Sequence, residues 1–286
     1  MKLPISAIIL TYNEEKNIQA CLDSVKDFVQ DIFIVDSFST DRTLEIAKKY
    51  TDKIFQHEFE NYGEQRNWAL NNLPIKTELI LNLDADHRIS NELKEELFGI
   101  FSSGRNNDVN GYLISRKTIF MGRWIKYGGH FPVYHGILFR KNYGICEESL
   151  YDQHFVIKGK VKKLKNTVND VVAESLSAFI ERHNQWASFE ANSQLMINSD
   201  QKTRLETNIF GNSMERRRFF KNKVYMKLPV LIRPFMYFFY RYFLKLGFLD
   251  GKEGLIFHFL QGFWFRFLVD AKICEMKKLP TLKGNK

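Results

Sequence analysis

Cysteine is scarce in this sequence, with only Cys21, Cys146 and Cys274 among 286 residues. None of the three belongs to a CxxC or CxxH pair, so we expect neither a structural zinc site nor a disulfide framework. A reducing compartment fits this usage best. We also expect no signal peptide, because the short apolar run near the start is followed at once by Asn13. We therefore expect the protein to start and remain in the cytoplasm.

Two common nucleotide-binding motifs are absent as well. No GxGxxG follows the first predicted strand and no GxxxxGK[ST] occurs, so neither a Rossmann dinucleotide site nor a P-loop is supported. The composition is ordinary, with 44% hydrophobic and 26% charged residues, which argues against disorder, a collagen-like repeat and a coiled coil. A chain of this length allows one or two domains with a large core.

Charge and phenylalanine are distributed unevenly. Residues 201–286 contain 18 Lys and Arg but only 6 Asp and Glu, and they also contain 13 of the 26 Phe. Residues 1–200 contain 24 Lys and Arg and 27 Asp and Glu. We therefore expect two domains with these bounds, the second a basic, aromatic, helical region. A basic region favours a polyanionic partner, and the apolar bulk around its charges favours an anionic membrane surface rather than nucleic acid.

Two apolar runs dominate the second region, at residues 235–249 and 255–269, and a turn at 247–251 joins them. Arg241 and Arg266 interrupt them, and a membrane-spanning helix needs roughly 20 mostly apolar residues. We therefore expect helices that lie in the membrane interface, with aromatic rings below the headgroups and basic residues at anionic lipid. A soluble helical subdomain or a dimer interface remains the alternative.

The first region alternates short apolar runs with helical patterns. The predicted strands cover residues 5–10, 32–35, 53–56, 79–83, 111–115 and 137–140. The predicted helices cover residues 18–28, 62–72, 91–102 and 174–198, with another beginning after Asp41. This alternation predicts an α/β fold, in which a mainly parallel sheet carries helices on both faces. Ligands of such sheets bind at the carboxyl ends of the strands.

Polar and acidic residues follow these predicted strands where a ligand is expected. They are Thr11, Tyr12, Asn13, Asp36, Asp84 and Asp86. Asp84 and Asp86 can face one cavity if Ala85, which lies between them, points away. Mg²⁺ and Mn²⁺ prefer such oxygen ligands and bridge them to substrate phosphates. A solvated Asp-rich turn is the alternative interpretation of this pair.

Four motifs occur in a fixed order, at residues 7–14, 34–43, 63–67 and 83–86. In sequence and spacing this set resembles the family 2 glycosyltransferases of the GT-A fold, and in particular the bacterial lipopolysaccharide-core and capsule glycosyltransferases of the WaaE type. The strong motifs lie within residues 5–155. The resemblance implies a GT-A domain, which the helical, membrane-associating region expected from the composition would follow.

The resemblance also implies roles for residues of the first three motifs. Thr11, Tyr12 and Glu14 would line the nucleotide pocket. Asp36 would accept a hydrogen bond from the base, since a carboxylate accepts where the uracil N3–H donates. Arg66 would contact the nucleotide or its diphosphate, a use that suits a planar cation with several donors.

The remaining roles belong to acidic residues. The resemblance implies that Asp84 and Asp86 hold Mg²⁺ or Mn²⁺ with the diphosphate, Asp86 most directly. An inverting transfer also needs a carboxylate as general base on the acceptor side. Relatives place a Glu in this region, and Asp152 aligns best with it. Glu148 and Glu147 are the alternatives for the base.

We therefore expect an inverting, metal-dependent glycosyltransferase. It would move a hexose from a nucleotide-sugar, a UDP-sugar by preference, to a lipid-linked or lipopolysaccharide or capsule glycan at the inner face of the cell membrane. Two other functions stay open. A sugar-phosphate nucleotidyltransferase normally has a Gly-rich loop after its first strand, which residues 11–15 lack. A non-catalytic membrane-docking scaffold would keep only a degenerate transferase body.

Overall fold

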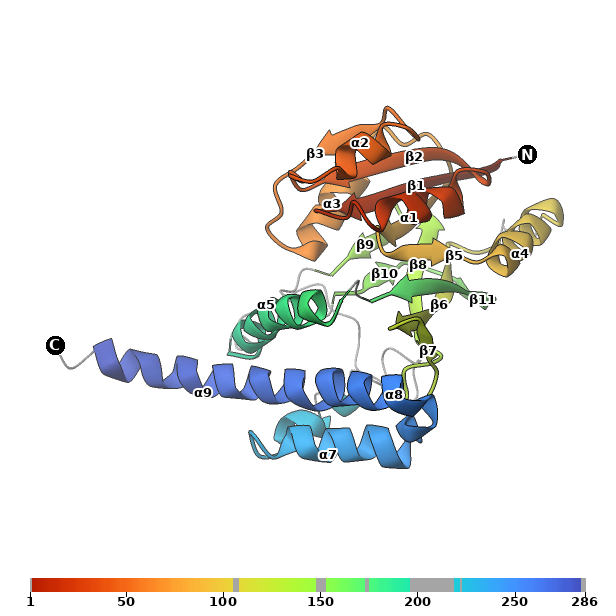
Figure 1. Cartoon of the computed structure of the whole chain (residues 1–286). Helices are drawn as coiled ribbons and strands as arrows, with labels where there is room; N and C mark the ends of the chain where they lie inside the picture. Colours follow the sequence, from red (N-terminus) through yellow and green to blue (C-terminus); the bar gives the residue numbers. More distant parts are fainter. Residues whose placement is uncertain are drawn as a thin grey trace. The chain divides into compact units, whose positions relative to one another are not determined.

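The structure is a computed structural model (Figure 1), and the chain in it divides into two compact units. The described residues are 2–104, 108–147, 153–172, 175–195, 219–221 and 223–283. The first unit comprises residues 1–117, 133–148 and 153–171, and the second comprises residues 118–132, 149–152 and 172–286. The predicted domain boundary between residues 200 and 201 lies outside the described residues.

Four parallel strands form one half of the sheet in the first unit. In spatial order they are β3 (Ile54–Gln56), β2 (Val29–Asp36), β1 (Leu3–Thr11) and β4 (Leu79–Asp84). All four predicted strands are thus confirmed. Strand β1 is central: its Thr11 lies opposite Asp36 of β2, and its Leu10 lies opposite Asp84 of β4. This register brings three polar strand ends to one edge of the sheet.

The other half of the sheet is antiparallel. After β4 follow β8 (Tyr134–Arg140), β6 (Gly111–Phe120), β11 (Val161–Val171) and β5 (His87–Ile89), while β9 (Gly144–Cys146) and β10 (Phe155–Ile157) form a separate pair. Strands β6 and β8 match the strands predicted from the sequence, whereas the other four were not predicted. Strand β11 was missed because it is largely polar and buries only Leu164, Thr167 and Val168 of its 11 residues. The sheet is therefore mixed.

Helices cover both faces of the parallel half, as predicted. The helices of the first unit are α1 (Ile18–Val25), α2 (Thr43–Ala47), α3 (Tyr62–Asn72) and α4 (Asn91–Ser102). One buried cluster joins Ile5 and Ile9 of β1 to residues of α1 and α4, whereas the opposite face joins Ile8 to Ala69 of α3. Successive strand residues point to opposite faces, so continuous apolar strands require this double cover.

Among the described residues, the only strands of the second unit are the end of β6 and β7 (Arg123–Ile125), which pair with each other. Its helical elements are α5 (Leu176–Leu195), η1 (Tyr225–Lys227), α7 (Arg233–Phe239), η2 (Tyr240–Leu244), η3 (Gly247–Asp250), α8 (Gly251–Phe257), η4 (His258–Trp264) and α9 (Phe265–Lys283). The two predicted apolar helices and their turn are confirmed, and α5 packs on α9. Among the described residues, no helix combines the length and hydropathy needed to cross a membrane.

Gly63 of α3 lies directly against the backbone of Glu147, the residue that follows β9. A Cβ atom at this position would lie 2.3 Å from the carbonyl oxygen of Glu147. We expect Gly63→Ala to lower the free energy of unfolding by about 1–3 kcal/mol, because backbone must shift to admit the methyl group. Urea denaturation of the purified protein measures this change.

Gly99 of α4 provides the matched control, because a Cβ atom there would meet nothing within 4 Å. Gly99→Ala should raise the free energy of unfolding by about 0.5–1 kcal/mol, since alanine is the better helix former. Equal stability of the Gly63→Ala protein and the wild type would contradict the close approach of α3 to Glu147.

Candidate active site

The polar strand ends meet at one edge of the sheet, as the sequence predicted. Thr11 is 4% exposed, and among the described residues its hydroxyl has no hydrogen-bond partner. Tyr12, the next residue, is 59% exposed. A buried hydroxyl without a partner is unusual in a protein core, because buried polar groups normally form hydrogen bonds. A large aromatic ring exposed to solvent beside it is unusual as well. Both features suit a surface that is completed by a ligand.

Asp84 is held by a fully buried arginine. The Nη2 of Arg66 donates to Asp84 Oδ1 at 2.5 Å and to the carbonyl of Leu83 at 2.7 Å, and its Nη1 donates to the carbonyl of Ile8 at 3.3 Å. Burial alone raises the pKa of Asp84. The charges of Arg66 and, less strongly, His87 and Arg116 overcome this effect and lower that pKa to about 2. Asp84 is therefore ionised at neutral pH.

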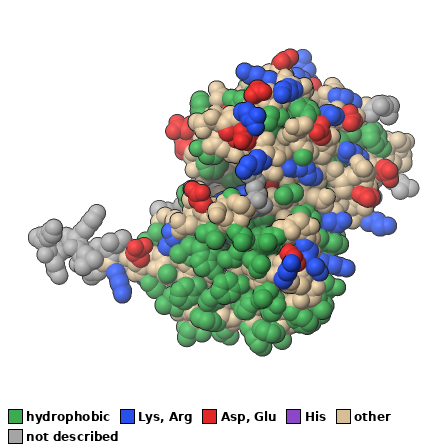
Figure 2. Space-filling model, viewed as in Figure 1, with side chains coloured by type: hydrophobic (Ala, Val, Ile, Leu, Met, Phe, Trp, Pro, Cys, Tyr) green, Lys and Arg blue, Asp and Glu red, His purple; other side chains and the backbone are tan. Residues whose placement is uncertain are grey.

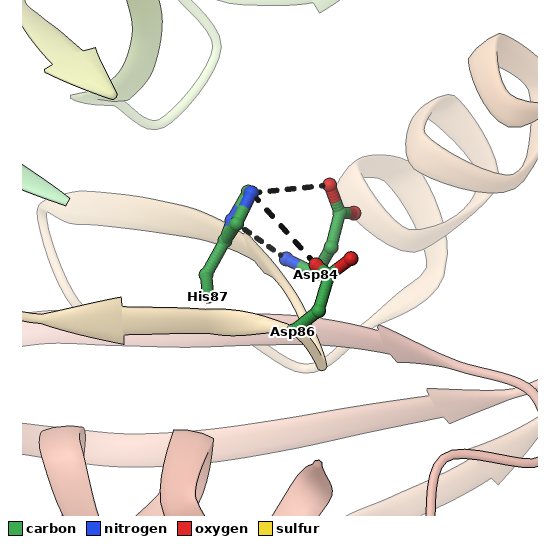
Figure 3. A group of neighbouring side chains, drawn as sticks. All are labelled: Asp84, Asp86 and His87. Carbon is green, nitrogen blue, oxygen red and sulfur yellow. Dashed lines mark hydrogen bonds and ion pairs between the residues drawn. The ribbon is translucent and has the colours of Figure 1, made fainter. Parts of the chain in front are cut away.

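Asp84, Asp86 and His87 form one cluster at the end of β4 (Figure 3). One ligand atom from each of the three lies within 4.8 Å of the others. Ala85 is 2% exposed and belongs to the hydrophobic core, so it points away from the two carboxylates as the metal-site prediction required. The side chains of Asp84 and Asp86 are 28% and 13% exposed, and both therefore reach solvent.

His87 was not predicted as a site residue, although it directly follows Asp86 in the sequence. The backbone N–H of Asp84 donates to His87 Nδ1 at 3.1 Å. Burial, with help from Arg116, lowers the pKa of His87 to about 4, so the ring is neutral at pH 7. A neutral ring that accepts at Nδ1 carries its proton on Nε2. That nitrogen lies 3.6 Å from Asp84 Oδ2 and 4.0 Å from Asp86 Oδ1.

This donor set fits a hard divalent cation. Mg²⁺ and Mn²⁺ take carboxylate oxygens and usually retain sites for water and phosphate, and one turn supplies two carboxylates here. In its observed hydrogen-bonding state His87 offers the carboxylates an N–H rather than a lone pair. The metal-ligand role of Asp84 and Asp86 stays a prediction, and His87 is better placed to orient the two carboxylates than to bind the cation itself.

Arg116 is a second residue that the sequence analysis missed. The predicted strand at 111–115 ended one residue before it, whereas β6 continues to Phe120. Its guanidinium lies 3.9 Å from Asp170, and its charge acts on both Asp84 and His87. Its side chain is 22% exposed, and among the described residues its buried Nε has no hydrogen-bond partner. A partly exposed cation at this edge suits a phosphate.

The motif at residues 63–67 braces the site from α3. Gln65 Nε2 donates to Ser37 Oγ at 3.1 Å, beyond the end of β2. Asn67 exchanges hydrogen bonds of 3.0 and 2.8 Å with the backbone of Cys146 in β9. Arg66 was predicted to contact the nucleotide or its diphosphate, and that contact stays a prediction. In this structure its side chain is fully buried, so it acts on the site by positioning Asp84.

Asp36 is fully buried beneath the loop that follows β2. Its Oδ2 accepts from the Ser39 N–H at 3.0 Å and from Gln56 Nε2 at 3.2 Å, and its Oδ1 accepts from the Ser39 hydroxyl at 2.5 Å. A carboxylate has about four acceptor sites, so one remains, but the Asp36 side chain has no solvent exposure in this structure. The predicted contact between Asp36 and the base stays a prediction.

Glu14 links the first loop to the acidic turn. Its Oε2 accepts from Asn17 Nδ2 at 2.8 Å, and Asn17 Oδ1 accepts from Arg88 at 3.0 Å. Arg88 also donates to the carbonyl of Ala85 at 2.8 Å. This chain of hydrogen bonds ties the ends of β1 and β4 together, whereas a direct contact from Glu14 to a nucleotide stays a prediction.

Of the three candidates for the general base, only Glu147 is among the described residues. It is fully buried, and its Oε2 accepts the His154 N–H at 3.0 Å. A carboxylate without solvent exposure is poorly placed to receive a proton from an incoming acceptor. Asp152 and Glu148 lie outside the described residues, and the base assignment to Asp152 stays a prediction.

Comparisons with known proteins bear on the family and the fold. Residues 6–146 match the model of Glycosyl transferase family 2. An uncharacterized glycosyltransferase of Rickettsia bellii (strain RML369-C) is 36% identical over 119 residues, which are 42% of this chain and 39% of that protein. The lipopolysaccharide core biosynthesis glycosyltransferase LpsC of Rhizobium meliloti (strain 1021) is 29% identical over 126 residues, 42% of this chain and 45% of that protein. The matches thus span less than half of these curated relatives.

A solved structure matches nearly the whole chain. It is the mannosyltransferase PcManGT from Pyrobaculum calidifontis in complex with GDP-Man and Mn²⁺, which is 13% identical, with a TM-score of 0.53 over 96% of this chain and 88% of that one. At this identity the likeness bears on the fold alone. The predicted GT-A fold with a C-terminal helical region is confirmed.

The buried neutral His87 should make stability depend on pH. Its pKa is about 4 in the folded protein against 6.5 for an ordinary histidine. Between these values the unfolded chain binds a proton that the folded chain does not, so stability falls as the pH falls. We expect the metal-free wild type to lose about 2 kcal/mol more than His87→Gln between about pH 7 and pH 5. Urea unfolding at both pH values tests this, and parallel pH profiles would contradict it.

Proposed function

Since residues 6–146 belong to the family 2 glycosyltransferases, we propose that the protein transfers a hexose from a nucleotide-sugar to a glycan acceptor. The observation that carries the proposal is the cluster of Asp84, Asp86 and His87 at the strand-end edge of the sheet. We propose a UDP-sugar as donor. The acceptor would be a lipid-linked or lipopolysaccharide or capsule glycan at the cytoplasmic face of the cell membrane; the similarity to LpsC, a lipopolysaccharide core biosynthesis glycosyltransferase, supports a glycan of this kind.

Asp84 and Asp86 would hold Mg²⁺ or Mn²⁺ in the proposed reaction. The bound cation would neutralise the diphosphate of the departing nucleotide. Arg66 keeps Asp84 ionised and oriented, and the buried His87 lies beside both carboxylates, with Nε2 3.6 Å from Asp84 Oδ2 and 4.0 Å from Asp86 Oδ1. Arg116 adds a positive charge at the same edge, where it can meet a phosphate oxygen. The Mn²⁺ and GDP-Man in the mannosyltransferase are a precedent on the same fold.

The nucleoside would lie at the ends of β1 and β2. The exposed ring of Tyr12 offers a flat apolar surface, and the hydroxyl of Thr11 offers a donor or acceptor beside it. The loop after β1 is already fixed, because Asn13 accepts from the Thr40 N–H at 2.8 Å and donates its own N–H to Ser39 at 2.9 Å. A preformed pocket loses less conformational entropy when the donor binds.

We propose an inverting mechanism in a single displacement. Asp152 would accept the proton of the acceptor hydroxyl as that oxygen attacks the anomeric carbon. The new bond from oxygen to the anomeric carbon forms as the bond from that carbon to the diphosphate oxygen breaks. The electron pair leaves with the nucleoside diphosphate, and the attack comes from the opposite face of the sugar. The burial of Glu147 supports a base from elsewhere in residues 147–152.

Replacement of Asp86 tests the proposed metal role. We expect Asp86→Asn to lower turnover by about 10²–10³-fold and to abolish metal-dependent UDP binding, because charge stabilisation of the leaving group is lost. Calorimetry with UDP and Mn²⁺ and an assay for released UDP measure the two effects. Glu95→Gln, at an exposed acid on α4, is the control and should match the wild type. Release of pyrophosphate instead of UDP would identify a nucleotidyltransferase and overturn the proposal.

Replacement of Asp152 tests the base separately. Asp152→Asn should slow transfer by about 10²–10⁴-fold, because a general base contributes a factor of this size. UDP binding should stay intact, since the residue acts on the acceptor and not on the nucleotide. Loss of transfer and of UDP binding together would contradict the assignment, and Glu148→Gln would then be tested in the same way.

A further inference from the structure

The helical stretch from residue 232 to 244 exposes its apolar side chains and buries its charged ones. The exposed positions follow helical spacing and are Ile232, Phe235, Met236, Phe239, Tyr240, Phe243 and Leu244. Arg233 and Arg241 of the same stretch are only 3% and 5% exposed. A helix on the surface of a soluble domain shows the reverse pattern, with its apolar stripe toward the core. The orientation of this stretch therefore needs an apolar partner.

The following helical stretch extends the same exposed surface. Rings of the two stretches touch, with centroids 4.6 Å apart for Phe235 and Phe263 and 6.3 Å apart for Phe238 and Phe259. Leu255, Phe259 and Phe267 add exposed apolar side chains there. We call the exposed apolar residues of 232–267 the aromatic face. Figure 2 shows hydrophobic side chains gathered over this unit.

Internal bonds hold the aromatic face outward. Arg233 pairs with the buried Asp270, whose Oδ2 also accepts the Leu231 N–H at 2.8 Å. Arg241 donates to the carbonyl of Gly128 and to Gln261 Oε1, both at 2.7 Å. To turn the rings inward, the protein would have to expose or break these buried polar contacts, which is costly. The outward orientation is therefore a stable property of the unit.

The exposed charges beside the aromatic face are all positive. The acidic residues of 219–271 are Asp250, Glu253 and Asp270. Asp250 and Asp270 are buried, and Glu253 pairs with Arg123 and Lys252. Among the described residues of 219–271, the exposed charged side chains are Lys223, Lys227, Lys245 and Lys252. Within the described part of residues 219–271, exposed phenylalanines are thus accompanied by exposed lysines and by no exposed acid.

We propose that the aromatic face docks into the interface of an anionic lipid bilayer. Contiguous exposed apolar surface of this kind marks an interaction site. Phenylalanine and leucine enter the boundary between headgroups and acyl chains, while lysines meet lipid phosphates. A second copy of the chain suits the surface less well than an anionic bilayer, because both copies would bring the same positive charges to the interface. The inference rests on the C-terminal unit and does not depend on the proposed transferase activity.

Vesicle binding tests the proposal with the full chain and no sugar donor. We expect the protein to sediment with vesicles of phosphatidylcholine mixed with phosphatidylglycerol, and much less with phosphatidylcholine alone. Added salt should weaken the binding, because it screens the lysines. Absence from both kinds of vesicle would overturn the proposal.

Two sets of substitutions separate the apolar and the electrostatic contributions. The triple variant Phe235→Ser, Phe239→Ser, Leu244→Ser should bind mixed vesicles at least ~10-fold more weakly, and its fold should persist because these side chains are 55–65% exposed. Lys223→Ser, Lys245→Ser and Lys252→Ser should each cost about five-fold, on anionic vesicles only. Phe59→Ser, at a 48% exposed ring of the first unit, should have no effect.

Sedimentation velocity without lipid tests whether a second copy of the chain covers the aromatic face instead of a bilayer. A dimer that the triple variant dissociates, with vesicle binding unchanged, would assign the aromatic face to a second copy and overturn the membrane proposal. Asp86→Asn should bind vesicles like the wild type. A failure of the transferase proposal and a failure of the docking proposal are therefore distinguishable.

Discussion

The buried ion pair between Arg66 and Asp84 is the interaction on which the rest of the site depends. The guanidinium of Arg66 has no exposed surface and also donates to the carbonyls of Ile8 and Leu83, so it joins α3 to β1 and β4 at one point. A buried cation is tolerated only with its anion in place. Asp84 is thereby fixed and ionised before any ligand binds. Because Asp84 begins the acidic turn, its fixed position also places Asp86.

The other loops of the strand-end edge are braced in the same manner. Gln65 reaches the loop after β2, and the chain from Glu14 through Asn17 and Arg88 reaches the acidic turn. Such bonds place the binding groups in advance, so less conformational freedom is lost when a donor binds. In the second unit, buried Arg233 and Arg241 fix the aromatic face outward. In both units, buried arginines position the groups that we propose to meet a ligand.

Periodicity and strand-end polarity predicted the parallel half of the sheet, its helices and the clustering of Thr11, Asp36 and Asp84, because continuous apolar strands and their ends leave a local pattern. Strand β11 has no such apolar pattern, because it is held in the sheet by strand pairing more than by hydrophobic residues. The burial of Arg66 and the positions of His87 and Arg116 depend on residues distant in sequence. The helical tail was predicted, but a pattern of apolar residues does not say which side of a helix faces the protein.

A titration of Mn²⁺ in the presence of UDP, followed by electron paramagnetic resonance, tests the central role of the ion pair most directly. The comparison is between the wild type and Arg66→Met, which keeps the volume of the buried side chain but removes its charge. We expect the variant to stay folded by circular dichroism and to bind Mn²⁺ about 10–100-fold more weakly, because Asp84 is no longer held and its pKa rises. Unchanged Mn²⁺ affinity in a folded variant would contradict the dependence of the metal site on Arg66.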